Sequence, residues 1–213
     1  MGPPQGNESP DRHAHWQQVY QTKATDAVSW YRPHLEASLK LLEEAGLCAG
    51  SRLIDVGGGA STLVDDLLAR GLRDITVLDV SEQALALARR RLGDRQALVT
   101  WLAADVLGAM LPGKAYDLWH DRAVLHFLTD PADAARYAAQ AARAVQSGGH
   151  AVIGGFAPDG PERCSGLPVA RRSAADIAAI LAPSFRLLAQ RAETHVTPGG
   201  SEQKFEYALL RRE

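Results

Sequence analysis

The chain has 213 residues, 46% of them hydrophobic and 23% charged, which is the composition of one soluble globular domain with a full core. A formal net charge of −2 excludes the basic surface that nucleic acids and anionic membranes require of a partner. The two cysteines, Cys48 and Cys164, are too few for a disulfide framework or a zinc site and favour a reduced, cytoplasmic compartment. No apolar run approaches the roughly 20 residues of a membrane span.

The first 50 residues are expected to lie outside the main domain. Residues 1–12 are rich in Pro, Gly and polar residues and predict a disordered leader. Residues 13–50 show helical spacing in two pieces, interrupted near Pro33, and predict a helical cap or lid; the second piece runs from about residue 34 to the C-cap Gly46. The aromatic residues of this cap either cover a ligand or simply dock its helices on the domain behind it.

From Arg52 onward, strand and helix patterns alternate. Ser81, Asp130 and Ser173 are typical N-caps of three of the helices. Strands are expected at 52–56, 74–80, 97–106, 115–121 and 150–157, and helices at 61–71, 81–93, 130–149 and 173–182, the third of them ended by the glycines at 148 and 149. Residues 185–196 and 204–212, joined by the turn signal TPGGS, predict an antiparallel hairpin.

This alternation predicts an α/β fold for residues 51–213. The expected architecture is a doubly wound, mostly parallel, seven-stranded sheet with helices on both faces and an antiparallel C-terminal hairpin.

The stretch LIDVGGGAST, residues 53–62, places three glycines directly after a buried strand. Such glycines let a ligand approach the backbone at the carboxyl end of the sheet. The dinucleotide fingerprint fails, because its sixth position is Thr62 rather than glycine, and no P-loop Gly-Lys-Ser/Thr follows. Asp79 ends the second strand about 20 residues later, the separation at which an acid binds a ribose diol, and Asp105 ends the third. A nucleoside without phosphate fits this set.

The ordered set Asp55-x-Gly57-x-Gly59, Asp79 and Asp105 resembles the class I S-adenosylmethionine-dependent methyltransferase family, from about Arg52 to the C-terminus. The resemblance implies a Rossmann-like fold, S-adenosylmethionine as cofactor with S-adenosylhomocysteine as product, and no metal. It places the cofactor among Asp55, Gly57, Gly58, Gly59, Ser61, Asp79, Val80, Asp105 and Val106. The density of aromatic residues in the cap adds Trp16 and Tyr20, whose rings are expected to face the cationic sulfonium.

Each cofactor contact has a role implied by the resemblance. Asp79 would take the ribose hydroxyls, Asp105 the adenine amino group, and Asp55 the glycine loop or the cofactor's amino group. Ser61 stands where the family often has a third glycine, which would narrow the pocket floor. Taken singly, Asp79 or Asp105 is as readily a helix cap or turn former.

The acceptor of the methyl group should lie beyond the fourth and fifth strands. The fourth strand is expected to bring Trp119 to the mouth as a substrate contact, with His120 as a general base, Asp121 orienting it or an amine, and Arg122 binding a carboxylate. An ordinary ion pair is the alternative for Arg122. We expect His126 to be a core residue.

The long loop after the fifth strand is expected to add Arg163 and Cys164 to the substrate site, although a free cysteine is more often a small packing residue. Arg171 and Arg172 are expected near the same mouth, and together these arginines favour a small anionic acceptor.

The predicted function is therefore methyl transfer from S-adenosylmethionine to a small anionic metabolite by a monomer or homodimer. A protein-lysine methyltransferase is the alternative, because the pair Asp121-Arg122 is similar to pairs found in some enzymes of that kind. A second alternative is a module that binds the cofactor without turnover.

Overall fold

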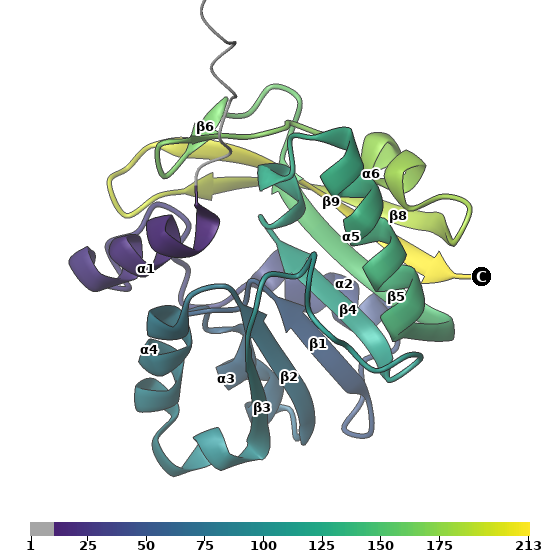
Figure 1. The fold of residues 1–213 in the computed structure, drawn as a ribbon, viewed down its shortest axis with the longest axis horizontal. Helices are drawn as coiled ribbons and strands as arrows, with labels where there is room; N and C mark the ends of the chain where they lie inside the picture. Colours follow the sequence, from purple (N-terminus) through teal and green to yellow (C-terminus); the bar gives the residue numbers. More distant parts are fainter. Residues whose placement is uncertain (1–10) are drawn as a thin grey trace, which may run out of the picture.

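The computed structural model describes residues 11–213 (Figure 1). Residues 1–10 of the expected leader lie outside the described part. The α-helices are α1 Arg12–Thr22, α2 Glu36–Glu44, α3 Leu63–Ala69, α4 Glu82–Leu92, α5 Pro131–Ala144 and α6 Ala174–Leu181. The strands are β1 Arg52–Val56, β2 Asp74–Asp79, β3 Val99–Ala103, β4 Tyr116–Arg122, β5 Val145–Phe156, β6 Arg163–Cys164, β7 Leu167–Pro168, β8 Phe185–Val196 and β9 Glu202–Arg212. Single 3₁₀ turns, η1 and η2, cover Gly93–Leu98 and Leu125–Phe127.

The main sheet has seven strands in the order β3-β2-β1-β4-β5-β9-β8. β1 to β5 run parallel to one another, and β9 is antiparallel to both β5 and β8. The order reverses beside β1, so β1 and β4 flank the position where ligands bind in doubly wound sheets. The expected fold class and the C-terminal hairpin are confirmed.

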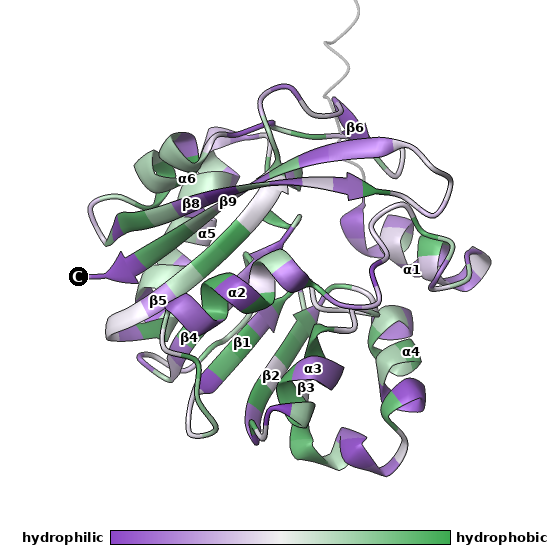
Figure 2. Cartoon of the chain, turned by 180° about the vertical axis from the view of Figure 1, so that it is seen from behind, coloured by the Kyte–Doolittle hydropathy of each residue, from purple (hydrophilic) through white to green (hydrophobic). Residues whose placement is uncertain are grey.

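Two layers of helices bury the two faces of the sheet. α5 and α6 cover one face (Figure 1) and α2 and α3 the other (Figure 2). Side chains alternate between faces along a strand, so Leu53 packs in the cluster of α2 and α3 while Ile54 packs with α5. Because both faces are covered, the central strands are apolar along most of their length (Figure 2).

The predicted helix starts agree with the observed caps. The side chain of Ser81 accepts a hydrogen bond from the backbone of Ala84, and that of Asp130 from Ala132. Ser173 forms a capping box with Asp176 at the start of α6. None of the helices formed by residues 11–213 is long and apolar enough to cross a membrane.

Two predicted helix ends were wrong. The first helix ends at Thr22, well before Pro33, and residues 23–35 form turns. α5 ends at Ala144, and the glycines at 148 and 149 lie inside β5. A Cβ atom at Gly149 would come within 2.8 Å of the carbonyl oxygen of Asp117 on β4, so this glycine permits close strand packing and does not end a helix.

Candidate active site

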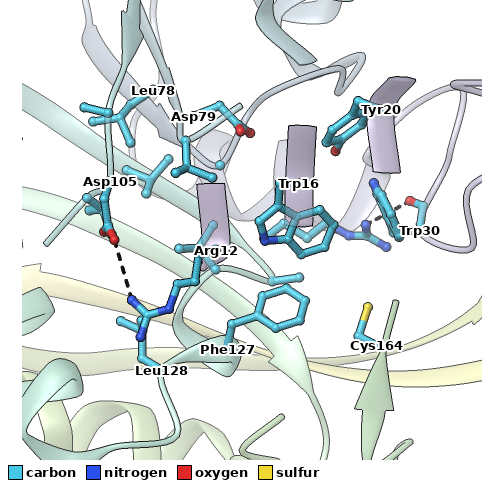
Figure 3. A pocket seen from close by; sticks show the side chains of 18 of the residues that line it. Arg12, Trp16, Tyr20, Trp30, Leu78, Asp79, Asp105, Phe127, Leu128 and Cys164 are labelled. Atoms are coloured by element: carbon cyan, nitrogen blue, oxygen red, sulfur yellow. Dashed lines mark hydrogen bonds and ion pairs between the residues drawn. The ribbon is translucent and has the colours of Figure 1, made fainter. Parts of the chain in front are cut away.

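A cavity of about 870 Å³ opens at the carboxyl ends of the parallel strands, beneath α1 (Figure 3). Its walls come from the loops after β1 to β4, from α1, and from β9. A second cavity of about 510 Å³ adjoins it. Both are lined by Tyr20, Trp30, Val56, Gly57 and Arg122.

The glycine loop after β1 borders both cavities. Gly57 and Gly59 have φ angles of +68° and +31°, which favour glycine. A Cβ atom at Gly59 would come within 2.5 Å of a carboxylate oxygen of Asp79. Gly57, Gly58 and Ser61 line the smaller cavity, so the backbone at the end of β1 is open to a ligand on that side.

Asp79 ends β2 and lines the larger cavity. Its Oδ1 accepts a hydrogen bond of 2.8 Å from the backbone of Ser81, yet the side chain is almost fully buried. Burial raises the pKa of Asp79 to about 7, with a further contribution from the charge of Asp55. The neighbouring Val80 lines the same cavity. A buried carboxylate with one free oxygen suits a donor pair such as a ribose diol.

β3 ends at Ala103, earlier than predicted, so Asp105 and Val106 lie in the loop that follows this strand. The Oδ1 of Asp105 accepts a hydrogen bond of 2.8 Å from the backbone of Leu107, and its Oδ2 lies 3.6 Å from Nη1 of Arg12 (Figure 3). Val106 is buried and forms an apolar wall of the cavity. Arg12, which the sequence did not single out, also pairs with Asp133 on α5.

The N-terminal cap lies over this cavity. Trp16 and Tyr20 both line it, and the Trp16 ring meets Phe127 edge-to-face at 5.1 Å between centroids. Gln17 fastens α1 to α4, because its side-chain oxygen accepts hydrogen bonds from Ser81 Oγ at 2.6 Å and from the α4 backbone at 2.9 Å. The cap is thus held by two anchors, Arg12 on Asp105 and Asp133 and Gln17 on the start of α4.

His120 is not at the mouth of the site, contrary to the prediction. It is 1% exposed, with Nδ1 2.7 Å from Oδ1 of Asp55 and Nε2 2.9 Å from Oγ of Ser38 on α2. It borders only the smaller cavity. Since both ring nitrogens have protein partners, the histidine has no nitrogen left for an acceptor.

Trp119 and Asp121 were also wrongly expected at the mouth. They point to the opposite face of β4, where both are fully buried and line neither cavity. Tyr137 donates its hydroxyl to Asp121 at 2.6 Å and accepts a hydrogen bond from the Trp119 indole at 2.9 Å. Asp121 also accepts from the backbone of η2. Burial raises its pKa to about 6. Because its carboxylate accepts hydrogen bonds from protein groups and lines neither cavity, we assign Asp121 a structural role.

Arg122 does reach the site and borders both cavities. Its guanidinium donates to the hydroxyl of Tyr207 at 3.0 Å and to the carbonyl of Trp30 at 3.1 Å, and it stacks over Phe205 at 4.4 Å from the ring centroid. Nη2 is buried and has no hydrogen-bond partner among the described residues. The ordinary ion pair that was the alternative for Arg122 is not formed with any carboxylate of residues 11–213.

Of the four residues after β5 that were expected at the acceptor site, one lines a cavity and three do not. Cys164 lines the larger cavity, and burial raises the pKa of its thiol to about 12. Arg163 is exposed, donates to the carbonyl of Gly166 and lines neither cavity, so its predicted place was wrong. Arg171 pairs with Glu162, and Arg172 donates to the carbonyls of Leu125 and Leu128. Neither of these two arginines lines either cavity, so their expected place was wrong as well. His126 is buried in the core, as expected.

Two aromatic wall residues were missed by the sequence reasoning. Phe127 lies in η2, shortly after β4, and follows the residues of that segment that were predicted to contact the acceptor. Phe205 lies on β9, and it reaches the cavity because β9 pairs with β5 and Phe156 faces Phe205 in the register. The position of the second could not be read from the sequence, because pairing between distant strands sets it.

The geometry fits the cofactor that the sequence implied. The Oδ2 of Asp55 is buried beside the glycine loop with no donor from any described residue, which leaves an acceptor for an ammonium group. Asp79 offers a carboxylate oxygen, and Leu78 and Val106 offer apolar surface for an adenine ring. Among residues 11–213, no group of three or more His, Cys, Asp and Glu side chains is arranged to hold a metal ion.

Comparisons with known proteins agree with this geometry. Residues 54–153 match the family described as a methyltransferase domain. The eEF1A lysine and N-terminal methyltransferase of Mus musculus is 26% identical over 141 residues, covering 63% of this chain and 20% of the mouse protein; the Bos taurus protein of the same name matches equally. The chain thus spans about a fifth of the length of these relatives.

Solved structures share the fold over nearly the whole chain. One, from work on the conversion of a disulfide bond into a thioacetal group during echinomycin biosynthesis, has a TM-score of 0.77 at 21% identity, covering 94% of this chain and 93% of the other. The Burkholderia thailandensis 1,6-didemethyltoxoflavin-N1-methyltransferase, bound to 1,6-didemethyltoxoflavin and S-adenosylhomocysteine, has a TM-score of 0.71 at 20% identity, covering 94% and 86%. Residues 54–153 thus form a methyltransferase domain, and the fold of the chain is similar to that of solved S-adenosylmethionine-dependent methyltransferases.

Proposed function

We propose that this protein transfers a methyl group from S-adenosylmethionine to a small molecule that carries a negative charge. One observation supports this most directly. The larger cavity runs from the two acids Asp79 and Asp105, past the glycine loop, to the guanidinium of Arg122, whose Nη2 has no hydrogen-bond partner among residues 11–213. A cofactor held by the acids leaves the arginine end for the acceptor.

The protein's own residues perform binding and alignment in this proposal. Asp79 accepts from the ribose hydroxyls, Asp105 from the adenine amino group, and Asp55 from the amino group of the methionine part. S-adenosylmethionine supplies an electrophilic methyl group on a sulfonium, a good leaving group that needs no metal. Arg122 holds the acceptor's anionic group, and alignment of the two reactants provides much of the rate.

The enclosure of the site favours a small acceptor. Trp16, Tyr20 and Trp30 of the cap line the cavity that Arg122 borders (Figure 3), so a folded protein would have to displace the cap to present a side chain. The Burkholderia thailandensis relative in fold, which contains a small molecule beside S-adenosylhomocysteine, supports the same choice. The mouse and cattle relatives are lysine and N-terminal methyltransferases by name, and they support the protein-lysine alternative.

Two measurements test the proposal. Calorimetry should show binding of S-adenosylmethionine and S-adenosylhomocysteine, and binding of NAD in their place would refute the assignment. Turnover of labelled S-adenosylmethionine against a metabolite pool and, separately, a protein lysate then distinguishes the acceptors. Labelled protein would favour the lysine alternative, and cofactor binding without any labelled product would favour the module that binds without turnover.

Arg122→Ala separates the acceptor from the cofactor. It should raise the acceptor KM with little change in cofactor Kd, and Arg163→Ala is the matched control because that arginine is exposed and lines neither cavity. A large loss of cofactor affinity in folded Arg122→Ala would instead assign this arginine to the cofactor's carboxylate.

A further inference from the structure

The arginine end of the larger cavity has aromatic walls. Phe127, Phe205, Trp16 and Trp30 come from four separate parts of the chain and all line it. Trp16 contacts both Trp30 and Phe127 edge-to-face, with ring centroids at 5.7 and 5.1 Å. Only 6% of the residues are aromatic, so this concentration is unusual for the chain. Flat apolar faces of this kind select planar ring systems by stacking and edge contacts.

Arg122 supplies the only charge at this end of the described cavity. The other cationic wall residue, Arg12, lies toward Asp105 and is already paired with it and with Asp133. The Arg122 guanidinium is oriented by Tyr207 and the Trp30 carbonyl, and Nη2 remains without a partner. A half-buried cation with a fixed orientation and no carboxylate partner suits an anionic group of the ligand.

Among residues 11–213, no side chain at this end of the cavity is suited to remove a proton from the acceptor. The wall contributes Cys164, whose thiol stays protonated near neutral pH because burial raises its pKa to about 12. Burial also raises the pKa of Tyr20. His120 has both ring nitrogens engaged, and His126 lines neither of the two cavities. An acceptor that reacts here must therefore be nucleophilic in the form in which it binds, without losing a proton to a side chain of the site.

We propose that the acceptor is a planar aromatic or heteroaromatic acid, bound as its anion with the ring among the aromatic walls and the charge on Arg122. This inference rests on the proposed function. The acceptor's electron pair forms the new bond to the methyl carbon, the methyl–sulfur bond breaks, and that bond's electron pair remains on sulfur. Anion and sulfonium cancel each other's charge, so no proton has to leave and no base is required.

The apolar walls assist such a reaction. Two opposite charges disappear along the reaction path, so their loss is easier in a site that excludes water than in bulk solvent. Arg122 at the same time favours the ionised form of the bound acid, because it is a fixed cation in a low-dielectric site.

Calorimetry on protein saturated with S-adenosylhomocysteine tests the binding site with three probes. Naphthoate is planar and anionic, naphthalenemethanol is planar and neutral, and cyclohexanecarboxylate is anionic but not planar. We expect naphthoate to bind at least about tenfold more tightly than either of the others, a difference of about 1.4 kcal/mol. Equal binding of the acid and the alcohol, or no binding of naphthoate, would overturn the inference.

Variants assign the preference to residues. Arg122→Gln should remove the preference for the acid over the alcohol, and Arg122→Lys should keep part of it. Phe205→Leu should weaken naphthoate more than cyclohexanecarboxylate. Arg163→Gln, at an exposed arginine, should change nothing. An unchanged preference in Arg122→Gln would refute the role of Arg122, and unchanged S-adenosylhomocysteine affinity shows that each variant is folded. Failure of S-adenosylhomocysteine to bind the wild type would refute the proposed function instead.

Discussion

His120 and Asp55 face each other across β4 and β1, with Nδ1 of the histidine 2.7 Å from Oδ1 of the aspartate. Both side chains are almost fully buried, and Ser38 of α2 completes the chain of hydrogen bonds at Nε2. The contact follows from strand register, because Asp55 and His120 are direct partners in the parallel pair. It joins the strand below the glycine loop to the helix that covers it.

Removing His120 should therefore destabilise the fold. His120→Leu leaves the buried Asp55 without its hydrogen-bond partner, and we expect a loss of about 1–3 kcal/mol in the free energy of unfolding, measured by urea denaturation. His34 forms a similar pair with Asp66 at 2.9 Å, but its side chain is 64% exposed. His34→Leu should thus change stability by less than about 0.5 kcal/mol. Equal effects of the two substitutions would contradict a structural role for the buried pair.

Cofactor affinity should depend on pH through Asp79. Its raised pKa of about 7 means that the empty site holds a proton near neutrality, whereas ribose hydroxyls donate best to the ionised form. Affinity for S-adenosylhomocysteine should rise between about pH 6 and pH 8, with proton release on binding below the pKa. Calorimetry in buffers of different ionisation enthalpy measures both quantities.

The same pKa shift has the opposite sign for the stability of the empty protein. The folded state binds the Asp79 proton more tightly than the unfolded chain, so this contribution is present at low pH and is lost as pH rises from about 4 to about 7.

Asp79→Asn should flatten the pH dependence of cofactor binding, and Asp79→Ala should weaken binding by about 1–3 kcal/mol. A pH profile that persists in Asp79→Asn would assign it to another group.

The cap should behave as a lid. Deleting residues 1–22 removes α1 with Trp16 and Tyr20, while the sheet keeps both layers of its helices. We expect a folded protein with weaker affinity for S-adenosylhomocysteine. In the full chain, amide exchange of α1 should slow when that ligand is added. Gln17→Ala, which removes only the contact to α4, should give a smaller effect, and unchanged exchange would reduce α1 to a packing element.

Substitution of Gly59 should reduce stability and cofactor affinity more than substitution of a glycine in open space. Gly59→Ala introduces a Cβ atom at positive φ that would meet the Asp79 carboxylate. We expect a loss of about 1–3 kcal/mol in the free energy of unfolding and weaker cofactor binding. Gly50→Ala is the control, because a Cβ atom there meets nothing within 4 Å. If both variants bind cofactor like the wild type, Gly59 does not set the position of Asp79.

The sequence alone determined the order of elements, the fold class and the acids beside the glycine loop. These are local features: Ser81 caps a helix, three glycines follow an apolar strand, and Asp79 stands at a fixed separation from Gly59. Alternation of strand and helix then leaves few topologies open, since parallel strands need right-handed crossovers. For this reason the residues predicted at the carboxyl ends of β1 to β3, all except Gly59, line one or both of the two cavities.

Only the tertiary structure decided the acceptor side. The prediction took four consecutive residues of β4 as one group, but side chains alternate across a strand, so Trp119 and Asp121 face Tyr137 while His120 faces Asp55. Which of those faces meets a cavity depends on what packs there. Arg122 and Phe205 are brought together by pairings between strands far apart in the chain, and no local pattern encodes such contacts, because they depend on register and on the packing of α1 and β9 over the strand ends.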